Sequence, residues 1–349
     1  MNYRLFGPCG LRVSELALGT MTFGEEWGWG ASREESRRIF DAFAAAGGNF
    51  IDTANRYTEG TSERLVGEFV AAERERFVVA TKYTLFNRKG DPNAAGNHRK
   101  NLVQSLEASL KRLGTDYVDL LWVHAWDHLT PVEEVMRGLD DVVRAGKALY
   151  VGVSDTPAWV VARANTLAEL RGWTPFAGIQ IEYSLIQRTV ERELLPMARG
   201  LGLAVTAWGV VGGGMLTGKY NPDAPAEQKA EPGRMRNTPA AARLAERNLR
   251  IAAQVREVAQ EAGRTPAQVA VNWVRHQPGI VIPIVGARSL RQLEDVLGAL
   301  EFELSPEQRS RLDEASRIEL GFPHEFTATP NIRELIYGGT LERILDRRP

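Results

Sequence analysis

Residues 49–54 read NFIDTA, and two similar apolar stretches follow, FVVATK at residues 77–82 and VDLLWVH at residues 118–124. Short apolar runs of this kind are typical of buried parallel strands. Each run carries a reactive side chain at its end or just past it, and these are Asp52 with Tyr57, Lys82, and His124. Because barrel enzymes hold their chemistry at the C-terminal ends of strands, the three runs predict a proton-handling site there.

Five more runs of the same character lie along the chain, separated by helical patterns, at residues 16–21, 149–154, 178–184, 203–209 and 280–286. This alternation indicates parallel βα units, and eight strands is the number of a closed barrel. An open doubly wound sheet usually carries a glycine-rich turn after its first strand, but here that turn reads GTMTFG. We therefore predict the α/β class and a (β/α)8 TIM barrel.

The remaining segments predict additions to one domain of residues 1–349. Residues 1–15 are expected to form an N-terminal hairpin, residues 16–300 the barrel, and residues 301–349 a C-terminal helical tail that begins with Ser305 as a cap. Ser32 and Glu35 have the spacing of a capping box. After the seventh strand, a loop rich in glycine and proline (210–239) precedes two extra helices at 241–262 and 266–276.

Composition narrows the possible partners and compartment. The 349 residues are 44% hydrophobic with a formal net charge of −1, which argues against nucleic acid as a partner. Cys9 is the single cysteine, as expected in a reducing compartment. No run approaches the ~20 apolar residues that span a bilayer, and the N-terminus lacks the apolar core of a signal peptide. A soluble, cytoplasmic protein without a membrane partner is expected.

The four strand-end side chains complement one another chemically. A tyrosine hydroxyl has an ordinary pKa of about 10 and needs a nearby positive charge to act as an acid at neutral pH. Lys82 supplies that charge, and Asp52 supplies the counter-ion that a buried lysine requires. His124 is placed to hydrogen-bond a substrate oxygen. Each residue alone has an ordinary structural explanation, but their coincidence on successive strand ends favours acid–base chemistry.

Two other motifs suggest different chemistry, and a third suggests an anion site. His124 and His128 raise the possibility of zinc, although a third converging ligand is missing from the sequence. Residues 213–220 read GGMLTGKY, close to a phosphate-binding loop but with Tyr220 in place of the required hydroxyl residue. After the eighth strand, a small-residue turn with Arg288 precedes a helix, and such turns bind phosphate in barrels.

With these residues the chain resembles the aldo-keto reductases over roughly residues 3–300. The shared motifs are FIDTA with Tyr57 and Ser62-Glu63, ATK ending at Lys82, His124 before Trp126-Asp127, Gly152-Val153-Ser154, Gln180 with Glu182-Tyr183-Ser184, Leu216–Tyr220, and Gly286-Ala287-Arg288 with Gln292. The resemblance implies reduction of an aldehyde or ketone by hydride from NADPH. It assigns Tyr57 as general acid, Lys82 and Asp52 as its tuning pair, and His124 as the donor that orients the carbonyl.

The resemblance also implies a set of cofactor contacts. Asp52 would touch the ribose, Ser154 and Gln180 would hold the nicotinamide carboxamide, Tyr183 would stack on the ring, and Arg288 would face the 2′-phosphate. The full expected set is Gly19, Thr20, Met21, Asp52, Ser154, Asp155, Gln180, Tyr183, Trp208, Gly209, Gly214, Leu216, Gly218, Lys219, Gly286, Ala287, Arg288, Gln292 and Asp295. Three residues depart from the family pattern and affect the cofactor side, namely Asp155, Gly209 and Val296.

The substrate and the assembly stay open at this point. Trp27, Trp29 and Trp126, with Tyr57 and His124, are expected to line the substrate pocket, and Trp208 lies nearby. The expected partner is a small-molecule aldehyde or ketone, no metal is expected, and assembly into a homo-oligomer is left open. Two alternative functions are retained: an NADPH-binding, redox-sensing regulatory subunit with little turnover, and a metal-dependent barrel hydrolase.

Overall fold

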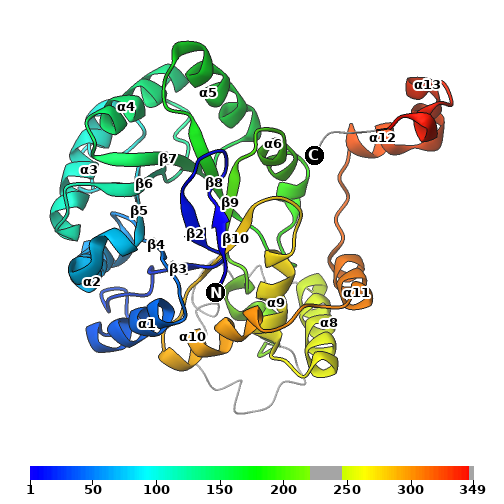
Figure 1. Ribbon diagram of the computed structural model, residues 1–349, viewed down its shortest axis with the longest axis horizontal. Coiled ribbons are helices and arrows are strands. Elements are labelled where there is room, and N and C mark those ends of the chain that lie inside the picture. The colour runs from blue at the N-terminus through cyan, green and yellow to red at the C-terminus, as the bar shows by residue number, and fades with distance from the viewer. Residues whose placement is uncertain (221–245, 346–349) are drawn as a thin grey trace.

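Eight parallel strands close into a barrel in the computed structural model, which describes residues 1–220 and 246–345 (Figure 1). Their order around the barrel is β10-β3-β4-β5-β6-β7-β8-β9. The strands are β3 Ala17–Gly19, β4 Phe50–Asp52, β5 Val78–Tyr83, β6 Val118–Val123, β7 Ala148–Ser154, β8 Phe176–Glu182, β9 Ala204–Trp208 and β10 Val281–Val285. Each overlaps one of the eight apolar runs, so the predicted TIM barrel is confirmed.

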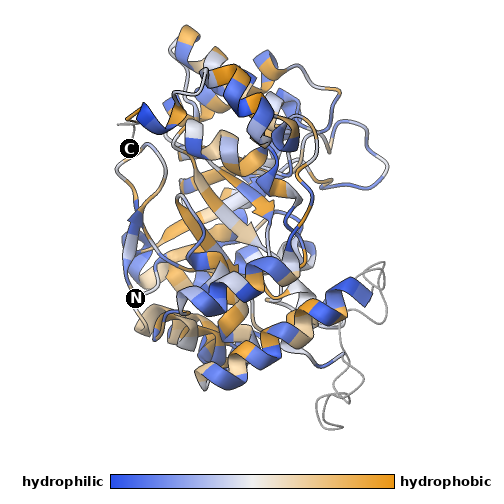
Figure 2. Ribbon diagram, turned by 90° about the vertical axis from the view of Figure 1, so that its right-hand side faces the viewer, coloured by the Kyte–Doolittle hydropathy of each residue, from blue (hydrophilic) through white to orange (hydrophobic). Residues whose placement is uncertain are grey.

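Helices surround the strands, and their buried apolar residues share one core with the outward-facing residues of the strands. Figure 2 shows hydrophobic residues along the strands, and hydrophilic and hydrophobic residues alternating along the helices. The surrounding helices are α1 Arg33–Ala45, α2 Thr61–Val70, α3 Arg99–Leu113, α4 Val132–Arg144, α5 Ala158–Arg171, α6 Leu194–Gly200, α9 Pro266–Arg275 and α10 Leu290–Leu297. Helix α8, Glu246–Ala262, packs beside α9 and against α11, Pro306–Ser316. The extra helices expected after the seventh strand are thus present in the described residues. Most of the predicted loop (210–239) and the first residues of the predicted helix 241–262 fall within residues 221–245, which lie outside the described residues.

The N-terminal hairpin closes the bottom of the barrel. Strands β1, Tyr3–Leu5, and β2, Arg12–Ser14, pair antiparallel, as predicted. Phe6, which directly follows β1, is fully buried. Its ring packs edge-on against Phe50 and Trp122, with ring centroids 5.7 Å and 6.1 Å apart. A Cβ atom on Gly178 would lie 2.7 Å from the Phe6 ring, so a glycine there leaves room for this plug. With the bottom filled, the C-terminal strand ends form the accessible mouth.

The cap predicted at the start of α11 is confirmed, whereas the structure differs from the capping box predicted at the start of α1. Ser305 and Gln308 form both halves of a capping box at α11. At α1, Ser32 accepts a hydrogen bond from the Glu35 N–H, but the Glu35 carboxylate does not return to Ser32. It accepts the N–H of Leu290, the first residue of α10, at 2.6 Å. The capping box predicted at Ser32 is therefore only half formed, because a carboxylate is better stabilised at the free N-terminus of another helix.

The C-terminal residues form an arm beyond α11. The arm comprises residues 318–345 and contains α12, His324–Ala328, α13, Pro330–Tyr337, and a short turn at Leu341–Arg343. It stands off from the barrel (Figure 1). Within the described residues, no helix is both long and apolar enough to cross a membrane.

Candidate active site at the carboxyl ends of the strands

One alternation rule places the candidate site residues. Successive side chains of a strand point to opposite faces, so every second residue faces the inside of the barrel. Phe50, Ala80 and Leu120 belong to the cluster that fills the barrel bottom. The side chains at the mouth belong to the same inward rows. Asp52 on β4 and Lys82 on β5 lie two residues beyond Phe50 and Ala80, and His124, just after β6, lies four residues beyond Leu120.

Lys82 is the centre of the site. Its side chain is fully buried, and its Nζ donates to Asp52 Oδ2 at 2.5 Å, to the Thr53 carbonyl at 2.8 Å and to the Tyr57 hydroxyl at 3.1 Å. Burial acts to lower the pKa of Lys82, but Asp52 and Tyr57 outweigh it, and the net pKa is raised. The predicted pair of Asp52 and Lys82 is thus brought together, with the lysine protonated and directed at the phenol.

Gln180 completes this network from the opposite wall of the barrel. Its side-chain amide donates to Asp52 Oδ1 at 2.9 Å, so both carboxylate oxygens of Asp52 have a partner. The sequence suggested a nicotinamide contact for Gln180 and did not suggest this one. The two residues are 128 positions apart in the chain, and closure of the barrel is what brings them together.

A strained turn directs Tyr57 into the mouth. Residues 57–60 form a short turn in which Thr58 and Glu59 have φ angles of 45° and 55°, a region that costs free energy for residues other than glycine. The Thr58 hydroxyl stabilises the turn by donating to the Phe23 carbonyl at 2.6 Å. Burial raises the pKa of the Tyr57 phenol, and the Lys82 charge offsets only part of that rise because Asp52 raises it again. The expected lowering by Lys82 is therefore present but does not prevail in the structure as it stands.

His124 lies beside Tyr57, with the two ring centroids 6.0 Å apart and the rings nearly perpendicular. Its backbone N–H is held by the Tyr83 carbonyl and the Thr84 hydroxyl. Burial, together with the positive charge of Lys82, lowers the pKa of the imidazole to about 3. The ring is therefore neutral at ordinary pH, and its buried Nδ1 has no hydrogen-bond partner among the described residues.

The loops that carry His124 are tied together by Asn97 and Asp127. The Asn97 amide donates to the Thr84 hydroxyl and to the Ala125 carbonyl, at 2.8 and 2.9 Å. The Asp127 carboxylate accepts from the Asn97 N–H and from both the N–H and the hydroxyl of Thr130. These bonds lock the position of His124.

A metal site with His128 is not supported, since no cluster of three possible ligands occurs in residues 1–220 and 246–345.

Trp208 and Asp155 form a second part of the mouth. The Trp208 indole N–H donates to Asp155 Oδ1 at 3.3 Å, and the indole is only partly buried. Asp155 has a φ of 42° and keeps an exposed surface, but the surrounding protein removes much of the water from its carboxyl group. This desolvation, reinforced by the nearby Glu182 charge, raises the pKa of Asp155 to about 6.

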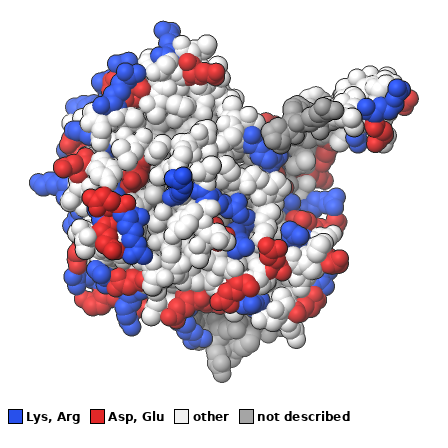
Figure 3. Space-filling model, in the orientation of Figure 1, with Lys and Arg blue, Asp and Glu red and all other residues white. Residues whose placement is uncertain are grey.

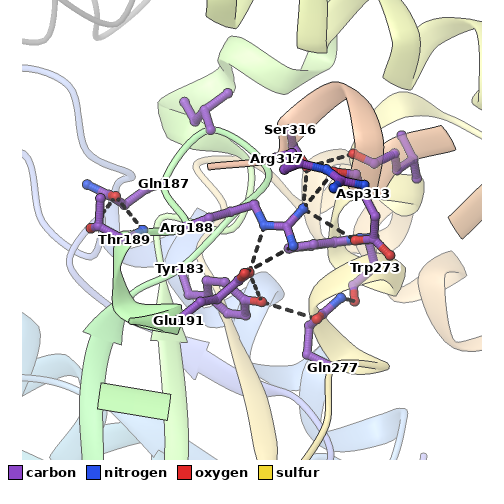
Figure 4. A network of polar contacts seen from close by, with 12 residues as sticks. Tyr183, Gln187, Arg188, Thr189, Glu191, Trp273, Gln277, Asp313, Ser316 and Arg317 are labelled. Atoms are coloured by element: carbon purple, nitrogen blue, oxygen red, sulfur yellow. Dashed lines mark hydrogen bonds and ion pairs between the residues drawn. The ribbon is translucent and has the colours of Figure 1, made fainter. Parts of the chain in front are cut away.

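Tyr183 does not reach the mouth, and its predicted stacking on the nicotinamide is wrong. It follows β8 in the outward row with Ile179 and Ile181, and its side chain is fully buried. Its ring packs against Trp273, and its hydroxyl donates to Glu191 at 2.7 Å and Gln277 at 3.1 Å (Figure 4). The inward residue at the neighbouring strand end is Trp208, which the alternation rule identifies from the sequence.

Several expected cofactor residues already have structural partners. The Thr20 hydroxyl bonds to the Asp52 carbonyl and to Ser62, the Gln292 side chain accepts the Arg288 N–H, and Asp295 accepts from Gln268. The side chain of Leu216 is fully buried, and Ser154 is nearly so. For such residues, contact with a ligand would require an exposed backbone group or an exchange of partners.

The remaining expected residues lie on two glycine-containing segments. Gly209 and Gly214 have φ angles of 73° and 92°, and Lys219 folds back over Gly214. Gly218 has no room for a Cβ atom because the Arg256 side chain lies 2.2 Å from that position. Across the mouth, Gly286 lies beside Gly19, and the hydroxyl of Thr22, which follows Met21, donates to the Ala287 carbonyl at 2.6 Å.

The side chain of Arg288 has no partner among the residues that the structure describes. Neither a hydrogen bond nor an ion pair engages its guanidinium there, whereas its backbone N–H is held by Gln292. It stands before the N-terminus of α10, where Ser289 caps the helix. An unpaired cation beside a helix N-terminus is suited to a phosphate group.

The tryptophans expected around the substrate divide into a pair and a single residue. Trp27 and Trp29 lie together with ring centroids 5.6 Å apart, and the Trp27 N–H donates to Glu59 in the Tyr57 turn at 3.2 Å. Trp126 is partly buried and packs against the main core. The pair is thus linked to the turn that carries the phenol.

Comparison with known proteins gives one consistent result. A model of the aldo/keto reductase family matches residues 15–317. Norsolorinic acid reductase A of Aspergillus parasiticus is 39% identical over 335 residues, which cover 93% of this chain and 83% of that protein. Aryl-alcohol dehydrogenase [NADP(+)] of Phanerodontia chrysosporium is 39% identical over 350 residues, with 93% and 88% covered. Aldo-keto reductase ausK of Emericella nidulans is 35% identical over 336 residues, with 93% and 84% covered.

Proposed function

The chain belongs to the aldo/keto reductase family of oxidoreductases, and we propose that it reduces an aldehyde or ketone to an alcohol with NADPH as hydride donor. The observation that most supports this proposal is the contact series at the mouth. Asp52 contacts Lys82 at 2.5 Å, Lys82 contacts the Tyr57 hydroxyl at 3.1 Å, and His124 lies beside the phenol. Such a series can deliver a proton to an oxygen on which negative charge develops.

Each residue of the series has a separate task in the proposed reaction. The nicotinamide, when bound, supplies the hydride that is added to the carbonyl carbon. Tyr57 donates its hydroxyl proton to the carbonyl oxygen, and the Lys82 ammonium stabilises the phenolate that remains. Asp52 balances the lysine charge and, with Gln180, holds its position. His124 is neutral and donates a hydrogen bond that orients the carbonyl oxygen before the proton moves.

The residues around the mouth fit a dinucleotide. Arg288, whose guanidinium is unpaired among the described residues, would hold the 2′-phosphate that distinguishes NADPH from NADH. Trp208 replaces Tyr183 as the aromatic side chain for the nicotinamide ring, because it lies in the inward row and is partly exposed. The glycine segments at 209–214 and 286–287 would carry the phosphates, and Ser154 and Asp155 would adjoin the carboxamide.

The proposed substrate is an aromatic aldehyde or its ketone equivalent. One relative is named an aryl-alcohol dehydrogenase that uses NADP(+). In this chain, Trp27 and Trp29 pack together and bond to the Tyr57 turn, which would place flat indole surfaces near the reacting carbonyl.

A single domain and a cytoplasmic location complete the proposal. Leu304 and Leu312 of the C-terminal segment share the main apolar core with the barrel, which favours one domain over residues 1–349. The single Cys9 favours the reducing cytoplasm.

A direct assay tests the proposal. Purified protein would be mixed with NADPH and a panel of benzaldehyde derivatives, aliphatic aldehydes and ketones, and oxidation of the cofactor would be followed by its absorbance. We expect turnover that is fastest with the aryl aldehydes and faster with NADPH than with NADH. No NADPH oxidation with any member of the panel, by protein that binds NADPH, would refute the reductase assignment and favour a regulatory role.

A further inference from the structure

Asp155 is a charged side chain at the barrel mouth that takes no part in the proposed proton transfer. It directly follows β7, whose inward row contains Gly152, where a Cβ atom would meet the Trp122 ring. Simple alternation would therefore turn Asp155 away from the interior. Its φ of 42° interrupts that alternation, and its carboxylate instead accepts the indole N–H of Trp208 at 3.3 Å. The left-handed backbone thus brings the carboxyl group to the mouth.

The charge of Asp155 reaches the residues that carry the proposed reaction. Burial is the main reason why the pKa of the Tyr57 phenol is raised, and the Asp155 carboxylate raises that pKa further. Desolvation raises the pKa of Asp155 itself, and the Lys82 ammonium opposes that rise. Atoms poised to react with each other lie about 3–3.5 Å apart. A cofactor ring that serves a carbonyl held by Tyr57 therefore lies within reach of the same negative charge.

The neighbouring groups do not cancel this charge. The Lys82 ammonium is already balanced by Asp52, with 2.5 Å between the charged atoms. The Trp208 indole is a neutral donor, so its hydrogen bond leaves the charge of Asp155 in place. The Glu182 carboxylate, at the end of β8, adds a second negative charge nearby. Within residues 1–220 and 246–345, no ion pair engages Asp155.

More distant charges provide no comparable bias. The formal net charge of the whole chain is −1, and basic and acidic side chains are interspersed over the face shown in Figure 3. Exposed charges farther away than about 8–10 Å are largely screened at physiological ionic strength. The local charges at Asp155 and Glu182 therefore act most strongly on a ligand beside Trp208.

A negative charge in this place distinguishes the two forms of the cofactor. The nicotinamide ring of NADPH is neutral, and loss of a hydride, which takes two electrons with one hydrogen nucleus, leaves the ring of NADP⁺ with one positive charge. An ionised carboxylate attracts the oxidised ring and has little effect on the reduced one. We propose that Asp155, when ionised, strengthens the binding of NADP⁺ relative to NADPH and so favours the bound state that alcohol oxidation requires. This inference rests on the proposed nicotinamide-dependent function.

Protonation of Asp155 should remove the preference. Desolvation, together with the Glu182 charge, raises the pKa of Asp155 to about 6. Lys82, Tyr57 and His124 keep their charge states between pH 8 and 5, because the first two have raised pKa values and the pKa of the third is lowered to about 3. The preference for NADP⁺ is therefore present at pH 8 and weakens as pH falls through 6. Binding of NADP⁺ should in turn release a proton near that pH.

Isothermal titration calorimetry of the purified protein with NADP⁺ and with NADPH tests the preference directly. At pH 8, Asp155→Asn should raise the dissociation constant of NADP⁺ about tenfold and leave that of NADPH within about twofold. Asparagine keeps the size of the side chain and an oxygen that accepts the Trp208 N–H, so the variant removes mainly the charge. Asp41→Asn is the matched control, because it removes the same charge from an exposed ion pair with Arg37 on α1. It should leave both constants unchanged.

The same titrations at pH 5 test the role of ionisation. The ratio of the two dissociation constants is compared, because the 2′-phosphate, which also titrates near pH 6, affects both cofactors alike. In the parent, the preference for NADP⁺ should fall about fivefold from pH 8 to 5, whereas the ratio should stay constant in Asp155→Asn. At pH 6, titrations in two buffers of different ionisation enthalpy should show more proton release with NADP⁺ than with NADPH, and only in the parent.

Three outcomes would contradict the inference. If both cofactors bind to Asp155→Asn with the ratio of the parent, the carboxylate does not favour the oxidised form, although the proposed function still stands. If both cofactors lose affinity equally, Asp155 acts through shape and not through charge. If the parent binds neither cofactor, the proposed function fails and this inference fails with it.

Discussion

The Nζ atom of Lys82 lies 2.5 Å from Oδ2 of Asp52, and both side chains are withdrawn from water inside the barrel mouth. Two charges in that position stabilise the fold only as a pair. The same pair presents a fixed ammonium to the Tyr57 hydroxyl. Stability and proposed chemistry are therefore joined in one contact, and each can be tested separately.

Replacing Asp52 by Asn should lower the free energy of unfolding by about 3–5 kcal/mol, because the buried Lys82 charge would lose its counter-ion. Chemical denaturation at neutral pH would measure the change. Asp41→Asn is the matched control. It removes an ion pair with Arg37 whose side chains are about half exposed, and the expected change is below ~1 kcal/mol. Equal losses in the two variants would contradict a special role for the buried pair.

Replacing Tyr57 by Phe should reduce the turnover number by about 10²–10⁴-fold, since only the proton donor is removed. Binding of NADPH, followed by quenching of tryptophan fluorescence, should stay within about twofold of the parent. A variant that retains most of its turnover would exclude Tyr57 as the general acid. A variant that no longer binds the cofactor would assign the residue a structural role.

The imidazole of His124 should stay neutral down to pH 5, because the protein environment lowers its pKa to about 3. Its ring-proton resonances, measured by NMR, should therefore not shift between pH 8 and 5. Since the unfolded state binds a proton that the folded state excludes, stability on account of His124 is present above about pH 6.5 and is lost as pH falls. His124→Gln should accordingly be less sensitive to acid, and a normal titration of His124 would contradict its assignment as a neutral donor.

Asp155 should make stability depend on pH in the opposite sense. Its pKa is raised from 3.8 to about 6, so the folded state binds an extra proton between those values. That contribution is present at low pH and is lost as pH rises through 6. The melting temperature of Asp155→Asn, expressed as its difference from that of the parent, should therefore be higher at pH 7.5 than at pH 5. A difference independent of pH would show that the carboxyl group is not perturbed.

Replacing Arg288 by Ala should raise the Michaelis constant for NADPH by about 10–100-fold, the loss expected for one charge-assisted phosphate contact. The constant for NADH should change little, because NADH lacks the 2′-phosphate. Arg291→Ala is a suitable control, since that arginine is exposed in the first turn of α10, three residues after Arg288. Parallel losses for both cofactors would argue against recognition of the 2′-phosphate by Arg288.

The strand-end residues were predictable because they depend on local order along the chain. Asp52, Lys82 and His124 follow apolar runs, and the alternation of side chains puts all three in inward rows. The same rule would have separated Trp208 from Tyr183, since the latter shares the outward row of Ile179 and Ile181. The two-residue period of a strand therefore predicts the orientation of this aromatic side chain better than the family motif does.

The amino-acid sequence by itself determined the eight strands, the hairpin and the four reactive side chains, because these follow from local periodicity and residue chemistry. Tertiary structure decided which partners those side chains find. Gln180 reaches Asp52 only because the barrel closes. The Glu35 carboxylate accepts the N–H of Leu290 only because α1 packs against α10. It also decided the perturbed pKa values of His124 and Asp155, since desolvation depends on atoms brought together from distant parts of the chain.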